Sequence, residues 1–254
     1  MGGPLLLLFA AAVQSGGLRA TSFFHDFSPL SGVKKNLEQL LDLNRLGEAN
    51  PSPWDMFANS VAIAGGVAIS VVSVGFLAAY AMTFLLRRGG RFWFSLTLLT
   101  LYFPVEARML QTFDVAVHLG LINSLTGLIL PVLPLALATF IFCQHMKTLP
   151  PQLLEAARLD GAGPIRFLFN IVVPLSLVPI GAVFIISFLI GWNQYLWPLM
   201  ISIDNTYFPL MRGINLVGAG SGASMLLAAI SITPALLLVI GFNRLLSRVT
   251  SVHL

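Results

Sequence analysis

The sequence has 254 residues, of which 57% are hydrophobic and 9% are charged. Because charged residues make up about a quarter of a soluble domain, this composition excludes an ordinary soluble protein and predicts an all-α, polytopic membrane protein. The net charge of +4 does not indicate nucleic-acid binding, since the arginines are scattered at the edges of apolar runs instead of forming one basic face. The single cysteine, Cys143, excludes an internal disulfide.

The first 56 residues fall into a short apolar run and a polar loop. Residues 1–14 hold about a dozen apolar positions, too few to cross a hydrocarbon core of roughly 30 Å. A signal peptide would carry its basic residue before the run, whereas Arg19 follows it. Residues 15–56 are predicted to form an outer loop, in which Val33, Leu37 and Leu40 recur at the spacing of an amphipathic helix. That helix either contacts a binding protein or packs on its own bundle.

The rest of the chain, residues 57–254, carries the longer apolar runs. The uncharged run 57–86 holds a span and ends at Arg87, Arg88 and Arg91, which marks a cytoplasmic end by the positive-inside rule. The next uncharged run, 92–105, would extend about 21 Å as a helix, which is too short to cross. We therefore predict that this helix continues past Glu106 and Arg108 and carries both charges to membrane depth.

Three further spans are predicted at 115–144, 167–203 and 213–243. Prolines are expected to bend the first of them at Pro131 and Pro134 and to kink the last near Pro234. The middle run carries polar and aromatic side chains, which either line a pathway or form an interfacial aromatic belt. These side chains are Trp192, Asn193, Gln194, Tyr195 and Trp197.

A polar interruption at 144–174 separates two of these spans. Its basic residues Lys147, Arg158 and Arg166 predict a cytoplasmic position. Pro150 and Pro151 suit the first turn of a helix, where a missing N–H has no cost.

That helix is predicted to end at Gly161, and Pro164 is predicted to begin a second one. Glu155 is in register to pair with Arg158 one turn later. The segment is therefore expected to form a compact helical elbow.

The elbow also carries a spaced motif: Glu155-Ala156-Ala157, then Gly161, then Ile171 and Pro174. This motif resembles the EAA loop of ABC-importer permeases, although Val173 stands where that family usually has Leu. Segments 101–109, 148–167 and 191–199 resemble permeases of the maltose-permease-like group, and within it those that import sn-glycerol-3-phosphate. The resemblance extends from about residue 36 to about residue 245, and the C-terminal tail is shorter than is usual for the family.

The resemblance implies an inner-membrane transmembrane domain of six spans. Residues 1–14 match only the second half of the family's first span, so an incomplete first span is expected, with a functional protein that begins upstream. Residues 15–56 would be a periplasmic loop, and residues 57–254 would form the permease domain, with the EAA loop at 144–174 on the cytoplasmic side.

The resemblance also implies the partners of the chain. These are a second permease subunit in a heterodimer, two ABC ATPase subunits, a periplasmic substrate-binding protein and membrane lipid, without nucleic acid or cofactor. In the family the EAA loop docks into a cleft of the ATPase. Carried onto this sequence, the expected coupling residues are Glu155, Ala156, Ala157, Asp160, Gly161 and Pro174.

The implied cargo is sn-glycerol-3-phosphate or a related glycerophosphodiester, and a neutral sugar or oligosaccharide is the alternative. Arg108 could offer a transient charge-assisted contact to a phosphate while Glu106 restrains it, or both could pair with neighbouring spans as structural contacts. The candidate pathway residues are Glu106, Arg108, Asn193, Gln194 and Tyr195.

An enzyme is disfavoured by the absence of catalytic motifs. The four histidines form no ligand pair of known spacing, and the sequence contains neither a G-x-S-x-G motif nor a P-loop. An intramembrane hydrolase that uses Glu106 or Asp114 is a distant alternative, and it would have no use for the elbow.

Overall fold

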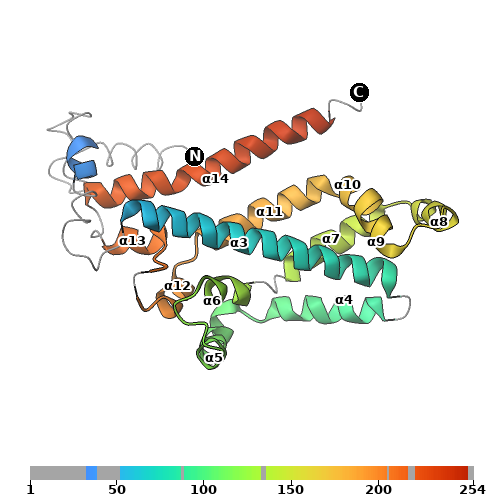
Figure 1. The fold of residues 1–254 in the computed structure, drawn as a ribbon, viewed down its shortest axis with the longest axis horizontal. Helices are drawn as coiled ribbons and strands as arrows, with labels where there is room; N and C mark the ends of the chain where they lie inside the picture. The colour runs from blue at the N-terminus through green and yellow to red at the C-terminus, as the bar shows by residue number, and fades with distance from the viewer. Residues whose placement is uncertain are drawn as a thin grey trace. The chain divides into compact units, whose positions relative to one another are not determined.

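The computed structural model describes residues 33–38, 52–86, 89–132, 136–204, 206–216 and 221–250, and all regular structure in these ranges is helical (Figure 1). The chain divides into two compact units, which we describe separately. The predicted partial span at 1–14 and most of the predicted loop at 15–56 lie outside the described residues.

Within the described residues, two helices are long and apolar enough to cross a membrane: Pro53–Leu85 and Gly222–Phe242. Two bent helix pairs bring the number to four if each pair counts as one span. They are Leu125–Val132 with Ala136–Thr148, and Pro164–Leu175 with Leu177–Trp192. The expected all-helical, multi-spanning architecture is therefore present, with fewer than six candidate spans in the described ranges.

Unit 1 contains the helix at 33–38, the start of α3 (Pro53–Tyr80), most of α6 (Leu125–Ile129), α12 (Leu196–Ile201), α13 (Leu210–Leu216) and α14 (Gly222–Thr250) as far as Arg244. Backbone groups tie these elements together. The Leu210 N–H donates to the Ser60 hydroxyl at 2.7 Å, and the Asn59 side-chain amide donates to the Thr206 carbonyl at 3.0 Å. These bonds fix the start of α3 against the segment that leads into α13.

Two tryptophans of unit 1 are buried. The Trp192 indole donates to the Ser231 carbonyl at 2.9 Å and meets the Phe57 ring edge-to-face, and the Trp197 indole donates to the Gly127 carbonyl at 3.0 Å. Each indole thus satisfies its donor inside the protein, as a buried tryptophan must. The interpretation as an interfacial aromatic belt is therefore wrong for these two residues.

The helix at 33–38 confirms helical structure in part of the predicted segment, but Leu37 of the expected apolar face is 45% exposed. Asn36 is fully buried, and its side-chain amide lies so close to Gly222 that a Cβ at that position would collide with it. This contact favours the alternative in which the segment packs on its own bundle.

Unit 2 holds the rest of α3, followed by η1 (Ala81–Leu85), α4 (Gly90–Leu99), η2 (Thr100–Tyr102) and most of α5 (Val105–His118). After η3 (Leu130–Val132) come α7 (Ala136–Thr148), α8 (Pro151–Leu159), α9 (Pro164–Phe167), η4 (Leu168–Val172), α10 (Val173–Leu175) and α11 (Leu177–Trp192).

Small residues allow α3 to approach two neighbours in unit 2. A Cβ at Gly75 would lie 3.2 Å from Ala138 of α7, and a Cβ at Gly191 of α11 would lie 2.9 Å from the Cα of Ala64. Small residues let helix backbones come close in lipid, where there is no hydrophobic force between helices. Phe76 and Phe142 fill the α3–α7 contact edge-to-face, with ring centroids 5.1 Å apart.

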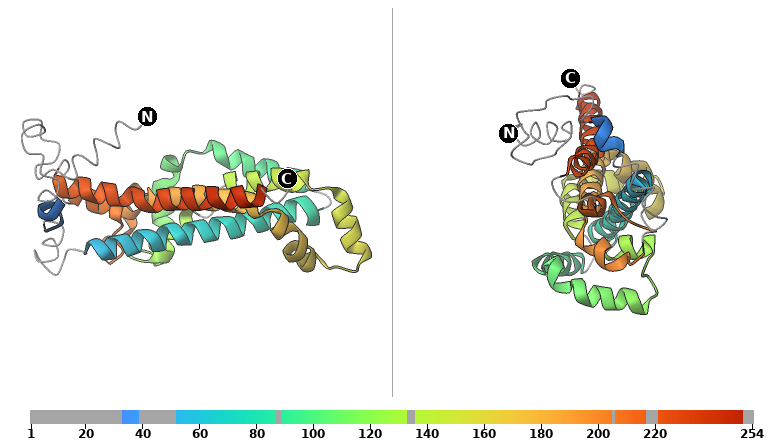
Figure 2. Two further views of the ribbon diagram at one scale, coloured as in Figure 1. Left: turned by 90° about the horizontal axis from the view of Figure 1, so that it is seen from above. Right: turned by 90° about the vertical axis from the view of Figure 1, so that its left-hand side faces the viewer.

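The predicted third span is wrong in its course. The helix that contains Phe92 ends with η2 at Tyr102, Phe103 is extended with φ −85° and ψ 113°, and α5 begins after Pro104. Proline lacks an N–H and disfavours helical backbone in the residue before it, which explains the break. Figure 1 shows α4 from the side and α5 end-on, and the right-hand view of Figure 2 reverses this, so the two helices cross at a steep angle. Arg108 therefore does not continue the axis of α4.

Three other boundaries differ from the predictions. The run at 115–144 is divided, because α5 ends at His118 and Gly120 and Asn123 adopt left-handed conformations before α6. The run at 167–203 breaks at Ser176 and again after Trp192. The helix α14 continues through Pro234 and includes Arg244, so the kink at Pro234 stays a prediction.

Candidate functional site

The helical part of the predicted elbow covers residues 150–176, to which the name is restricted from here on, and it forms as its local chemistry predicts. Pro150 is the extended N-cap of α8, with φ −60° and ψ 132°, and Pro151 occupies the first helical position. A proline there removes only an N–H that would have no partner within the helix. The predicted start of the first elbow helix is confirmed.

The end of α8 has the hydrogen bonds of a Schellman motif. Gly161, with φ 70°, donates its N–H to the Arg158 carbonyl at 3.1 Å, and Ala162 donates to the Ala157 carbonyl at 2.8 Å. A Cβ at Gly161 would meet nothing within 4 Å. Glycine is therefore required there by the left-handed backbone and not by lack of space.

The second half of the elbow begins with α9, whose first residue is Pro164 and whose N-cap is Gly163, as predicted. The helix then widens into the π-helical segment η4, in which the Val173 N–H bonds to the Leu168 carbonyl. Pro174 follows immediately and leaves the Asn170 carbonyl without its α-helical donor, which accounts for the irregular hydrogen bonding. At the buried Ser176 the axis bends by 77° into α11. Pro174 thus shapes the elbow.

The inner face of the elbow is anchored to unit 2. Ala157, Phe167, Leu168 and Val172 are buried in one apolar cluster with residues of α3 and α7. The elbow is therefore a folded part of this unit and not a loose loop.

The outer face of the elbow is open. Glu155, Ala156, Asp160 and Gly161 are exposed, so the motif separates into a buried Ala157 and exposed neighbours. In the described part of the chain no ion pair joins Glu155 to Arg158, which corrects the predicted pairing.

Two apolar side chains that the sequence interpretation did not select stand out on this face. Leu159 is 89% exposed and Ile165 is 74% exposed, on either side of the turn at Gly161. Their position beside a glycine turn in a polar segment was the available signal. Exposed apolar groups ringed by polar ones are typical of a protein-docking surface.

Basic side chains gather at the same end of unit 2. Within the elbow, α8 lies beyond the start of α4 and the end of α7 (Figures 1 and 2), and the elbow adds Arg158 and Arg166 to the exposed Arg91 and Lys147. The Lys147 ammonium sits 4.2 Å from the centroid of the Phe94 ring, a cation–π contact between α7 and α4.

The candidate pathway residues belong to two different units. Glu106 and Arg108 are on the part of α5 in unit 2, where Arg108 is half-buried. Asn193, Gln194 and Tyr195 form the turn between α11 and α12 in unit 1. The Gln194 Oε1 atom is buried and has no hydrogen-bond partner among the described residues.

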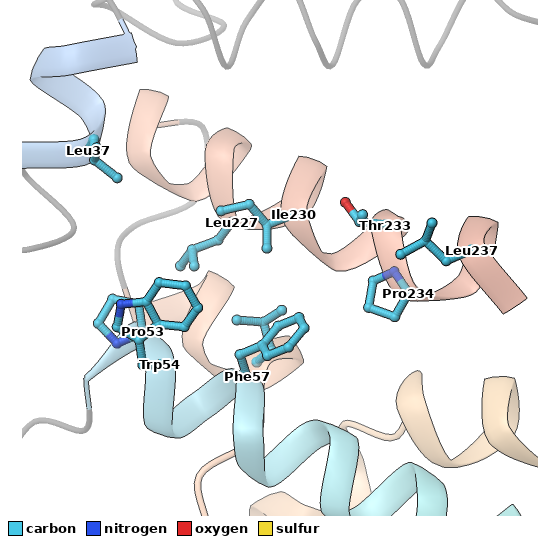
Figure 3. Close-up of a pocket in the computed structure, with 10 residues that line it drawn as sticks. Leu37, Pro53, Trp54, Phe57, Leu227, Ile230, Thr233, Pro234 and Leu237 are labelled. Atoms are coloured by element: carbon cyan, nitrogen blue, oxygen red, sulfur yellow. The ribbon is translucent and has the colours of Figure 1, made fainter.

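Unit 1 also contains a pocket of about 360 Å³ beside α14 (Figure 3). Its lining is apolar and includes Trp54, Phe57, Leu227 and Pro234. A phosphate or a sugar needs several charged or hydrogen-bonding partners, whereas this lining has no charged side chain and offers little besides the Thr233 hydroxyl. The pocket is therefore unsuited to either candidate cargo.

Comparisons with known proteins identify a family, several relatives and a solved structure that are similar to this chain. The family model described as "Binding-protein-dependent transport system inner membrane component" matches residues 71–252. The sn-glycerol-3-phosphate transport system permease protein UgpE of Yersinia pestis bv. Antiqua (strain Antiqua) is 43% identical over 175 residues, which cover 68% of this chain and 62% of that protein. The protein of the same name from Salmonella typhi is 37% identical over 208 residues, covering 80% of this chain and 74% of that protein.

A solved structure shares the fold. It is titled as a bacterial ABC transporter involved in the import of the acidic polysaccharide alginate, and it matches with a TM-score of 0.78 at 18% identity. The match covers 96% of this chain and 90% of that one.

These findings confirm the resemblance that the motif at 155–174 indicated. They also confirm the interpretation of the chain as a multi-pass inner-membrane transport component and not an enzyme. The chain belongs to the family of binding-protein-dependent transport system inner membrane components.

Proposed function

We propose that the chain is a permease subunit of an ATP-driven, binding-protein-dependent importer with six spans. In this proposal residues 1–14 contribute to the first span, residues 15–56 form a periplasmic loop and residues 57–254 form the transmembrane domain. The elbow faces the cytoplasm, which agrees with the basic residues gathered at its end of unit 2.

The observation that carries the proposal is the division of the elbow into a buried and an open face. Ala157 and Phe167 hold it to unit 2, while Leu159 and Ile165 are exposed beside Glu155 and Asp160. An apolar centre with a charged rim suits a protein partner, and an ATPase subunit is the partner that the family supports.

The proposed assembly contains a second permease subunit, two ATPase subunits and a periplasmic binding protein. Closure of the ATPases on ATP would push the elbow, which moves as a rigid body because its inner face is packed. The spans would then rock between outward and inward openings, as is usual for alternating access. In this mechanism the ATPase contacts the exposed residues Glu155, Ala156, Asp160 and Gly161. Ala157 holds the elbow to unit 2, and Pro174 sets the shape of the elbow.

The proposed cargo is sn-glycerol-3-phosphate or a related glycerophosphodiester, by analogy with relatives that are about 40% identical. Arg108, with Glu106 beside it in the chain, is the proposed phosphate contact. The uncharged turn at Asn193, Gln194 and Tyr195 would receive the hydroxyl groups.

A neutral sugar is the second candidate. Two observations favour it: the break before α5 removes the reason to expect Arg108 at membrane depth, and the side chains at 193–195 suit hydroxyls without a phosphate.

Reconstitution tests the proposal. The subunit, its partner permease, the ATPases and the binding protein are placed in vesicles, and uptake of labelled sn-glycerol-3-phosphate is compared with uptake of labelled disaccharide. We expect uptake of the phosphate ester that requires ATP and the binding protein. Uptake of the disaccharide alone would support the second candidate, and ATP-independent uptake of both would contradict an ABC importer.

A further inference from the structure

Tyr80, the last residue of α3, touches the elbow directly. Its side chain is 5% exposed, and its hydroxyl donates to the Pro164 carbonyl at 2.7 Å. Pro164 is the first residue of α9 and lies 84 positions away in sequence. Among the described residues, this side-chain hydrogen bond joins the elbow to a helix that is distant from it in sequence.

The bond does not compete with the folding of the elbow. The Pro164 carbonyl also accepts the Leu168 N–H at the end of α9. A carbonyl oxygen has two lone pairs, so it can accept both donors at once. Tyr80 therefore holds the elbow at the point where its second helix begins without opening that helix.

Aromatic rings surround the bond. The Tyr80 and Phe84 rings lie 5.5 Å apart, and the Phe84 and Phe167 rings meet edge-to-face at 5.4 Å. Phe167 is in turn 6.4 Å from Tyr80, so the three rings form one closed group. Ring pairs at these separations are attractive beyond the area they bury.

The same group joins the two π-helical segments of unit 2. Phe84 belongs to η1, which continues α3, and Phe167 is the residue before η4. Single π-helical turns are frequent at functional sites because they are locally less regular than the α-helix around them. Two irregular segments are thus held together by one hydrogen bond and three rings.

We propose that Tyr80 is a positioning residue that joins the elbow to α3, so that movement of the elbow is transmitted to the membrane span. This inference rests on the proposed function. The apolar contacts of Ala157, Leu168 and Val172 hold the inner face of the elbow but are not directional. The hydroxyl bond is directional and fixes Pro164 to the end of α3.

The test is Tyr80→Phe in the complete reconstituted transporter. The variant keeps the ring and removes only the hydroxyl. We expect ATP hydrolysis to continue while the cargo carried per ATP falls about two- to tenfold, the range given by loss of one neutral hydrogen bond. A purely structural role would lower hydrolysis and uptake together. Tyr102→Phe, at an 84% exposed tyrosine, is the matched control and should leave the ratio unchanged.

The outcomes distinguish the proposed role of Tyr80 in joining the elbow to α3, called the joint below, from the proposed function of the whole chain. A wild-type complex without ATP-dependent uptake overturns the proposed function, and the joint with it. If the wild-type complex transports and the Tyr80→Phe complex carries the same amount of cargo per ATP, the joint is overturned but the proposed function is not. If Tyr80→Phe does not reach the membrane, Phe84→Leu keeps the hydroxyl and loosens only the rings. It should lower the same ratio, and an unchanged ratio would again overturn the joint.

Discussion

The elbow at 150–176 and the stretch at 90–115 contrast within unit 2. In the elbow, each predicted helix boundary lies where a proline or glycine was expected to set it. In the stretch at 90–115, a single crossing helix was predicted, and two helices with different directions are found. The first prediction rested on backbone chemistry, and the second rested on the length needed to cross a bilayer.

The difference shows which kind of inference is robust. Pro151, Gly161 and Pro164 act on their own φ angles and on hydrogen bonds within a few residues. A span-length argument assumes a straight helix, and Pro104 breaks that assumption. The elbow should therefore be sensitive to single local changes, and the α5 region less so.

Gly161→Val should have the largest effect. A β-branched residue in the left-handed conformation is strained by about 1–2 kcal/mol, and the turn should rearrange and misplace Leu159. We expect ATP-dependent uptake to be abolished while the subunit still reaches the membrane. The matched control is Gly163→Val, because Gly163 has φ −70° and open space around its Cβ position. Equal uptake by the two variants would show that the turn is not needed.

Glu155→Lys should be nearly as severe. The exposed carboxylate is proposed to contact the ATPase, so reversing its charge should remove uptake without loss of folded protein. Gln152→Lys adds a charge at another exposed position of α8 and should be tolerated. Co-purification of the ATPase with each variant is the measurement. Retention of the ATPase at wild-type levels by Glu155→Lys would contradict the contact.

Comparing Ala157→Leu with Ala156→Leu distinguishes the buried inner face of the elbow from its exposed outer face. Ala157 is 4% exposed within the apolar cluster, so a larger side chain should overpack it at about 1–3 kcal/mol. We expect a lower Tm in detergent for Ala157→Leu and an unchanged Tm for the exposed Ala156→Leu. The same Tm for both variants would mean that the inner face is not packed.

Arg108→Gln should have the smallest effect of the four. As a transient phosphate contact in a wet pathway, Arg108 should contribute to rate and little to stability. We expect a partial fall in maximal uptake of the phosphorylated cargo with altered substrate-stimulated ATPase activity, and part of the rate retained by Arg108→Lys. If Arg108→Gln folds, assembles and transports at the wild-type rate, Arg108 has no part in the pathway.

Much of the candidate site could be predicted from sequence because the motif residues and the helix breakers are adjacent in the chain. The sequence could not separate buried Ala157 from exposed Ala156, because that depends on which face of α8 meets α3 and α7. Nor could it pair Tyr80 with Pro164, since nothing local links residues so distant in the chain. Trp192 and Trp197 were ambiguous for a similar reason, as their carbonyl partners come from α14 and α6.

Cross-linking from the elbow tests the central claim most directly. Leu159→Cys in a Cys143→Ser background carries a short photoreactive label in the assembled transporter, and Tyr102→Cys carries the same label as the comparison. Both positions are more than four-fifths exposed, at 89% and 84%. If the elbow docks on the ATPase, the label at 159 should give a covalent ATPase adduct whose yield changes with ATP, and the label at 102 should give none. A transport-active complex that gives no ATPase adduct from position 159 would contradict the account.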